Sequence, residues 1–314
     1  MEKNNNFSEF CRSEDVSEID YCTENLMDVS HCGLIDTHCH LDFIFTRLKN
    51  SQYANVQSFY EFWRKFHLEF PKRAFLGCIA VFCQPLTWME MGYEKTFLNE
   101  NSHYVWGTYG VHPHYADTFT AEVFYALEEI LKRDKVVAVG EIGLDYSSKN
   151  NVNRKTQKRV LEVLLKMAID HKLPICLHIR DADEDGLKIL KKVNLPKNHP
   201  IHLHCFTGKW ETCQQWIEAY PELKVGFTPI ISKTNLTFLH DVVKKLPLDK
   251  ILLETDAPYF LPRQAPMSQC GFSHPGFVIH TAAQVAKFKG ISIESVIQAT
   301  TENAVKVYNL QLKK

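Results

Sequence analysis

The sequence lacks several features that would mark a membrane, secreted or nucleotide-binding protein. It has no run of about 18 apolar residues, the length that a membrane-spanning helix needs. Residues 1–20 contain no apolar stretch of about 7–15 residues, so they do not resemble a secretory signal. No GxGxxG or P-loop pattern occurs, and we expect no nucleotide cofactor. These absences predict a protein with no membrane segment and no nucleotide cofactor.

Signatures of disulfide frameworks and zinc knuckles are also missing, although the chain has 10 cysteines. No two cysteines form a CxxC pair. Several of them lie in apolar, strand-like segments, namely Cys78, Cys83, Cys176 and Cys205. This pattern is typical of free thiols in a reducing compartment, and it predicts a protein of the cytoplasm or the nucleus.

The chain has almost no net charge, because 36 lysines and arginines oppose 37 acidic residues. Residues 1–30 hold eight acidic and two basic residues, which leaves 34 basic and 29 acidic residues in the remainder, a balance of +5. Such a balance argues against a broad, sequence-independent clamp on nucleic acid. It permits a local phosphate-binding site.

Eight short apolar runs alternate with helix-like stretches along the chain. Near-continuous apolar runs are typical of parallel strands buried on both faces. The expected fold is therefore a (β/α)₈ barrel, with a doubly wound open sheet as the less favoured alternative. We expect a disordered acidic extension over residues 1–30 and one barrel domain over residues 31–314. The expected strands are Leu34–Leu41, Ala74–Cys83, Tyr104–Val111, Val136–Leu144, Pro174–Ile179, Ile201–Phe206, Leu223–Phe227 and Ile251–Glu254.

Apolar residues at helical spacing occupy most of the intervals between these strands. The aromatic segment Ser58–Phe70 is predicted to be a helix whose aromatic residues lie in the core or, as the less favoured alternative, at an interface. We expect the protein to be a monomer. The other expected helices are Ala121–Arg133, Thr156–His171, Trp210–Ala219, Asn235–Lys245, His280–Phe288 and Ile293–Tyr308.

Residue types that bind metals occur at the ends of five of the eight expected strands. In a barrel, catalysis takes place at the carboxyl ends of the strands. His38 and His40 are two residues apart, so both face the same side of the first strand. The other candidates are Glu141 in the fourth strand, His178 and Arg180 in the fifth, His202 and His204 in the sixth, and Glu254 and Asp256 in the eighth.

The conjunction of these residues is more informative than any one of them. A single histidine in an apolar strand is more often a hydrogen-bonded core residue than a ligand. Even four of these histidines and two of these carboxylates are too many ligands for one tetrahedral zinc ion. They suit two divalent metal ions that share a carboxylate bridge. Imidazole favours Zn²⁺ or Mn²⁺ and carboxylate permits Mg²⁺, so this donor set does not select one metal.

The sequence around these residues resembles the TatD family of metal-dependent nucleases, within the amidohydrolase-like barrel superfamily. The resemblance extends over about residues 34–310, and the segment CGFSHPG (270–276) is most similar to the animal members. The matching segments are IDTHCHLD (35–42), YGVHPH (109–114), VGEIGLDY (139–146), LPICLHIRDA (173–182), HCFTG (204–208) and ETDAPYFLP (254–262).

The resemblance implies a role for each matching residue. One metal ion would be held by His38, His40, Glu141 and Asp256, and a second by Glu141, His178 and His204, with Glu141 as the bridge. His112 and Arg180 match positions at the substrate phosphate. Asp256 would also take the proton from the attacking water. The implied activity is that of a deoxyribonuclease, with exonuclease action and RNA as a substrate both left open.

Neighbouring residues receive more ordinary interpretations. His202 lies one layer below His204, where core packing is the better interpretation, and Glu254 would support a ligand by hydrogen bonding. Cys39 should face the helices and not the barrel interior. His114 either reaches the barrel mouth or closes its loop, and the basic segment 149–159 is either a solvated helix face or a rim for nucleic acid.

Two other function classes compete with the nuclease. A small-molecule amidohydrolase or lactonase would use a similar ligand set on the same barrel. Many such enzymes carry a carboxylated lysine on the fourth strand, where this chain has Glu141, and this favours the nuclease. A non-catalytic binding module is less favoured, because every expected ligand is present.

Overall fold

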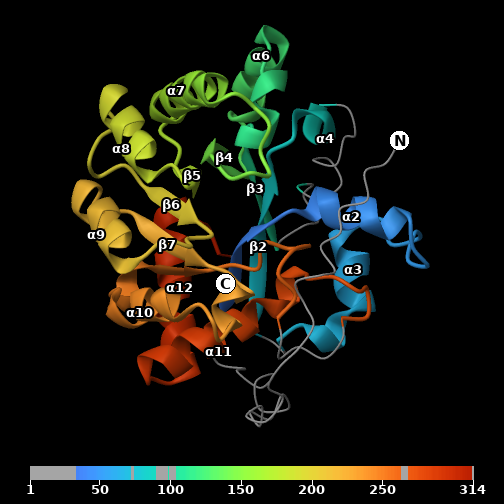
Figure 1. Ribbon diagram of the computed structural model, residues 1–314. Coiled ribbons are helices and arrows are strands. Elements are labelled where there is room, and N and C mark those ends of the chain that lie inside the picture. Colours follow the sequence, from blue (N-terminus) through green and yellow to red (C-terminus); the bar gives the residue numbers. More distant parts are fainter. Residues whose placement is uncertain (1–32, 72–73, 90–97, 99–103, 263–267, 313–314) are drawn as a thin grey trace.

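Eight parallel strands form one sheet in which each strand pairs with the next one along the chain (Figure 1). The computed structural model describes residues 33–71, 74–89, 98, 104–262 and 268–312, so the extension expected over residues 1–30 lies outside the described residues. The strands are β1 (Leu34–Cys39), β2 (Phe75–Phe82), β3 (Val105–Tyr109), β4 (Val136–Asp145), β5 (Ile175–Arg180), β6 (Ile201–His204), β7 (Lys224–Phe227) and β8 (Ile251–Leu253).

The sheet closes on itself between β1 and the residues that follow β8. Cys39 forms a parallel bridge with Ala257, and the backbone N–H of His40 donates to the carbonyl of Ala257 at 2.7 Å. The N–H of Asp256 donates to the carbonyl of His38 at 2.9 Å. Sequential order and closure confirm the predicted (β/α)₈ barrel. They also rule out the doubly wound alternative, in which the strand order reverses at a switch point.

Helices surround the barrel on its outer side (Figure 1). The α-helices are α2 (Leu41–Lys49), α3 (Phe59–Lys65), α4 (Pro85–Met89), α6 (Ala121–Ile130), α7 (Arg154–His171), α8 (Asp183–Lys192), α9 (Trp210–Ala219), α10 (Thr237–Lys245), α11 (Val278–Lys289) and α12 (Ile293–Tyr308). Short 3₁₀ turns lie at His67–Glu69, Pro113–Thr118, Pro229–Ser232, Leu248–Lys250 and Pro275–Phe277. None of the helices in the described part of the chain is long and apolar enough to cross a membrane.

The predicted helix over Ser58–Phe70 was too long. Ser58 begins α3 with a complete capping box, in which its side chain accepts from the N–H of Glu61. The helix ends at Lys65, and Phe70 adopts an extended backbone. Phe70 precedes Pro71, and a residue before proline disfavours the helical region. The predictions also missed α2, α4 and α8.

The aromatic residues of this segment divide between core and surface. Phe59, Phe62 and Phe66 are buried, as the preferred interpretation predicted. Tyr60 and Trp63 are exposed on the other side of α3.

The end of α12 closes the lower part of the barrel interior. Tyr308 and Leu310 pack in one apolar cluster with inward residues of the strands, among them Ile79 and Leu252. The larger cluster fills the space between strands and helices and contains Cys39, as predicted. The polar residues at the carboxyl ends of the strands therefore lie next to a packed apolar cluster that closes the rest of the barrel interior.

Candidate metal centre

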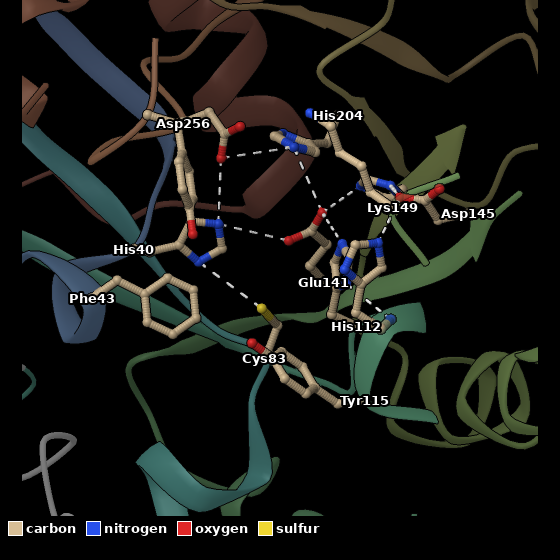
Figure 2. A pocket seen from close by; sticks show the side chains of 13 residues that line it. His40, Phe43, Cys83, His112, Tyr115, Glu141, Asp145, Lys149, His204 and Asp256 are labelled. Atoms are coloured by element: carbon tan, nitrogen blue, oxygen red, sulfur yellow. Dashed lines mark hydrogen bonds and ion pairs between the residues drawn. The ribbon is translucent and has the colours of Figure 1, made fainter. Parts of the chain in front are cut away.

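The strand ends bring all six predicted ligands together at the carboxyl end of the barrel. β1 and the residue after it carry His38 and His40, β4 carries Glu141, β5 carries His178 and β6 ends at His204. Asp256 follows β8. All six side chains are buried or nearly so, and Figure 2 shows several of them pointing toward one another.

Glu141 lies at the centre of this cluster, and its two oxygens face different histidines. Oε1 lies 2.7 Å from Nδ1 of His178 and 3.6 Å from Nε2 of His204. Oε2 lies 3.6 Å from Nε2 of His38 and 3.8 Å from Nε2 of His40. One carboxylate therefore joins two groups of imidazoles, which is the arrangement that a bridging ligand needs.

Asp256 completes the group around His38 and His40. Its Oδ1 lies 3.3 Å from Nε2 of His40 and 3.7 Å from Nε2 of His38. The nearest nitrogen of the other group, Nε2 of His204, is 4.0 Å away. Asp256 is thus aimed mainly at one of the two histidine groups.

The pKa values in the cluster are shifted in opposite directions. Burial alone would raise the pKa of Glu141, but neighbouring imidazoles, His112 and His204 foremost, hold it well below its ordinary value. Burial lowers the pKa of His40, but Asp256 and Glu141 raise it to about 9. Glu141 is therefore ionised and requires nearby positive charge, which protons or a bound cation can supply.

The donor atoms fit divalent cations. His38, His40 and Asp256 have donor atoms within 4.8 Å of one another, as do His38, Glu141 and His204. Burial and the charge of His204 lower the pKa of His38 to about 4, so its ring is neutral and has a free lone pair for a metal. Buried imidazoles that face carboxylates are the donors that Zn²⁺ and Mn²⁺ accept.

Buried polar groups contact the ring nitrogen of His204 that faces away from Glu141. Nδ1 of His204 lies 3.0 Å from Oε2 of Glu254, and Oε1 of Glu254 accepts the N–H of Cys205 at 2.6 Å. Nε2 of His202 lies 2.9 Å from Oε2 of Glu254, off the line of a hydrogen bond, and its Nδ1 lies 2.6 Å from the hydroxyl of Tyr308. Glu254 thus lies where the sequence predicted. His202 is buried as expected but contacts polar groups.

An open cavity of about 640 Å³ lies above the cluster. Lys149 reaches it from the loop after β4, and Tyr115 and Phe43 stand at its rim (Figure 2). Its lining residues are His40, Phe43, Cys83, His112, His114, Tyr115, Glu141, Asp145, Lys149, His178, His204, Asp256 and Tyr259.

The two predicted phosphate-binding residues differ in position. His112 lines the cavity, and its Nδ1 accepts the N–H of His114 at 3.1 Å. The proton of its neutral ring is therefore on Nε2, which lies 3.6 Å from Oε1 of Glu141. Arg180 ends β5 with a partly exposed side chain, and it is not among the described residues that line the cavity.

Sequence reasoning missed Asp145 and left His114 undecided. Oδ2 of Asp145 lies 2.9 Å from Nε2 of His114 and 3.4 Å from Nε2 of His178. His114 therefore reaches the mouth. Asp145 is four residues after Glu141 on the same strand, so the even spacing could have placed both on one face.

Glycines allow β4 and β5 to approach closely beside these residues. A Cβ atom on Gly143 would lie 1.7 Å from the carbonyl oxygen of His178, and one on Gly140 would lie 2.4 Å from Cβ of Cys176. Only a residue without a side chain fits at either position. The glycines on both sides of Glu141 therefore let its strand pair closely with the strand that carries His178.

Comparison with known protein families finds one whose profile covers most of this chain. The profile of the family described as TatD related DNase matches residues 35–309. The human 3'-5' RNA nuclease TATDN2 is 38% identical over 278 residues, which are 88% of this chain and 35% of the human protein. The chain thus spans about a third of the length of that relative.

A bacterial relative agrees with this assignment, and a solved structure shares the fold. The 3'-5' ssDNA/RNA exonuclease TatD of Pantoea ananatis is 34% identical over 209 residues, which are 66% of this chain and 79% of that protein. The crystal structure of YJJV, a TatD homologue from Escherichia coli, has the same fold, with a TM-score of 0.72, 24% identity and coverage of 89% of this chain and 99% of that one. The chain belongs to the family of TatD related DNases.

Proposed function

We propose that this chain is a divalent-metal-dependent nuclease that removes nucleotides from the 3' end of single-stranded DNA or RNA. The position of Glu141, with one oxygen toward each of two histidine groups, is the observation that carries the proposal. The relatives from human and Pantoea ananatis are both named 3'-5' nucleases, one of RNA and one of single-stranded DNA and RNA.

The proposed ligands form two sets that share Glu141. One set is His38, His40, Glu141 and Asp256, and the other is Glu141, His178 and His204. Bound Mg²⁺, Mn²⁺ or Zn²⁺ would lower the pKa of water and neutralise charge that develops on the phosphoryl oxygens. Asp145 holds the second nitrogen of His178, and Glu254 holds that of His204, so each ring has a fixed orientation.

The chain's own side chains would handle the proton and the phosphate. Asp256 lies at the base of the cavity with Oδ1 directed at His40, and we assign to it the proton of the attacking water. His112 lines the cavity with its proton on Nε2, and this N–H would donate a hydrogen bond to a non-bridging phosphate oxygen. Arg180 would add a positive charge from the end of β5.

The cysteines bear on the compartment in which the protein works. We infer a monomer that works in the cytoplasm or the nucleus. The seven cysteines in the described part of the chain are free thiols, and six of them are buried. Free thiols are typical of a reducing compartment.

The first experiment compares wild-type protein with Glu141→Ala on end-labelled DNA and RNA oligonucleotides. Removal of metal by a chelator should abolish cleavage and added Mn²⁺ or Mg²⁺ should restore it. Glu141→Ala should lose cleavage by a factor of about 10³ or more, since it removes a ligand from both sets. Product ladders distinguish stepwise loss of terminal nucleotides from internal cutting.

The partly exposed carboxylate Glu222, which pairs with Lys306, provides the matched control, and Glu222→Ala should cleave like the wild type. Metal content of each variant should be measured in parallel. Full activity after complete metal removal would refute the proposal. Metal-loaded protein that cleaves neither polymer but hydrolyses a lactone or amide would favour the small-molecule alternative.

A further inference from the structure

The rim of the cavity carries an aromatic group beside the candidate ligands that the proposed chemistry does not use. Tyr259 lines the cavity three residues after Asp256, and its side chain remains 38% exposed. Its ring centroid is 6.2 Å from that of His40. The ring of Phe43 also stacks on His40, with ring centroids 4.9 Å apart and planes 24° apart. Aromatic surface thus begins directly beside a proposed metal ligand.

Arg47 fixes the position of the Tyr259 ring. Its guanidinium carbon lies 5.4 Å from the centre of the Tyr259 ring and 5.6 Å from that of Phe272. The same guanidinium donates to the carbonyl of Pro258 at 3.4 Å. The Phe272 ring and the Pro258 carbonyl hold Arg47 over the Tyr259 ring, and this contact restricts the orientation of that ring. Tyr259 therefore needs little reordering to bind a flat ligand.

Hydrogen bonding by the Tyr259 hydroxyl does not explain why this residue lines the cavity. None of the hydrogen bonds in the described part of the chain involves this hydroxyl, and burial raises its pKa above the ordinary value, so it stays protonated. Tyr259 is also not part of the apolar core clusters. The part of the residue that these polar groups leave unused is its ring, which lines the cavity.

From this arrangement we propose that Tyr259, held by Arg47, is a stacking site for one of the two nucleobases that flank the scissile phosphate. The proposal rests on the proposed nuclease function and adds how that site selects its substrate. Stacking accepts any base, because every base has a π face, and it requires that the base be unpaired. The site would thus favour frayed or single-stranded ends over blunt duplex ends.

The test removes the Tyr259 ring from the protein and a base from the substrate, first separately and then together. Wild-type protein and Tyr259→Ala are compared on single-stranded oligonucleotides that either are intact or carry one abasic position at the terminal or the penultimate nucleotide. On the intact strand, Tyr259→Ala should lower kcat/KM about 5- to 150-fold, the range measured for single stacking residues. On the strand that lacks the stacked base, the variant should equal the wild type.

Two further variants separate stacking from other effects. Tyr259→Phe keeps the ring and should cleave within about 2-fold of the wild type on all strands, because stacking needs no hydroxyl. Tyr125→Ala removes a tyrosine that is 69% exposed on α6 and should have no effect. An abasic position ten or so nucleotides from the end should leave the difference between wild type and Tyr259→Ala unchanged.

The possible outcomes distinguish failure of the stacking proposal from failure of the nuclease proposal. If the wild type cleaves and the losses from Tyr259→Ala and from the abasic positions simply multiply, the stacking site is wrong and the nuclease proposal stands. Loss of cleavage in Tyr259→Phe would also overturn it, since the hydroxyl would then be the group that acts. If the wild type cleaves none of the strands in the presence of metal, the nuclease proposal itself fails.

Discussion

At the scale of single residues, the candidate centre depends on groups that never reach the cavity. Glu254 is fully buried and its Oε2 lies within 3.0 Å of nitrogens of both His202 and His204. Burial opposes its ionisation, but the neighbouring imidazoles lower its pKa below the ordinary value. An ionised Glu254 keeps a proton on Nδ1 of His204, and that leaves Nε2 of His204 free to bind a metal.

Glu254→Gln should therefore weaken metal binding although it changes no ligand. We expect a loss of about 10- to 100-fold in affinity for Mn²⁺, since removal of such a supporting carboxylate has effects of this size. Isothermal titration of metal-free protein with Mn²⁺ measures it, and the thermal midpoint shows whether the fold survives. Glu222→Gln changes a partly exposed carboxylate at the surface and serves as the control. An unchanged affinity in a folded Glu254→Gln protein would contradict this role.

At the scale of secondary-structure elements, α11 contains a histidine that has no part in the proposed reaction. His280 is 3% exposed, and neither ring nitrogen has a hydrogen-bond partner in the described part of the chain. Burial, with the nearby His274, lowers its pKa from the ordinary 6.5 to about 4. The ring is therefore neutral in the folded protein and takes up a proton on unfolding at mildly acidic pH.

The pKa of His280 thus differs between the folded and the unfolded chain, and this difference lowers the stability of the folded protein in acid. Between pH 6.5 and 4 the unfolded chain binds more protons than the folded one, so stability falls as pH falls through this window. From pH 7 to pH 5 the loss due to His280 is about 2 kcal/mol. Urea unfolding at the two pH values should show this loss in the wild type and lack it in His280→Leu.

The exposed His67 gives a comparison for this prediction. His67→Gln should leave the difference between pH 7 and pH 5 as it is in the wild type. An identical pH dependence in the wild type and in His280→Leu would mean that His280 is already protonated or hydrated in the folded state.

At the scale of the whole molecule, charge near the cavity is mixed and not uniformly positive. The lining includes three carboxylates, Glu141, Asp145 and Asp256, and one lysine, Lys149. Arg47 of α2 contacts the lining residue Tyr259. The chain as a whole has a formal charge of -1. Such a surface can neutralise only a few phosphates around the one that reacts.

Binding of single-stranded nucleic acid should therefore depend weakly on salt. About three contacted phosphates would give a slope of about -2 for log K against log salt, at roughly -0.7 for each phosphate. Fluorescence anisotropy of a labelled oligonucleotide with metal-loaded Asp256→Asn, over about 50–300 mM salt, measures this slope without cleavage. A slope of about -5 or steeper would instead indicate an extended basic track outside the cavity.

The sequence by itself determined the fold and most of the candidate cluster. Eight apolar runs mark the strands because a parallel sheet buried on both faces tolerates few polar residues, and each predicted strand overlaps an observed one. The helices at Trp210–Ala219 and Ile293–Tyr308 have the predicted bounds. His38, Glu141 and His204 were identifiable because burying a polar side chain at the end of an apolar strand costs free energy unless a partner or a bound ion compensates.

Only the tertiary structure decided which side chains act together. Short polar helices such as α8, with acidic residues in its first turn and Lys191 and Lys192 in its last, were missed because apolar periodicity was the criterion. The pairing of Asp145 with His114 and the position of Tyr259 beside His40 join residues from different strands and loops. Local spacing sets the face on which a residue lies, whereas distances across the barrel follow from closure of the sheet, which no single segment encodes.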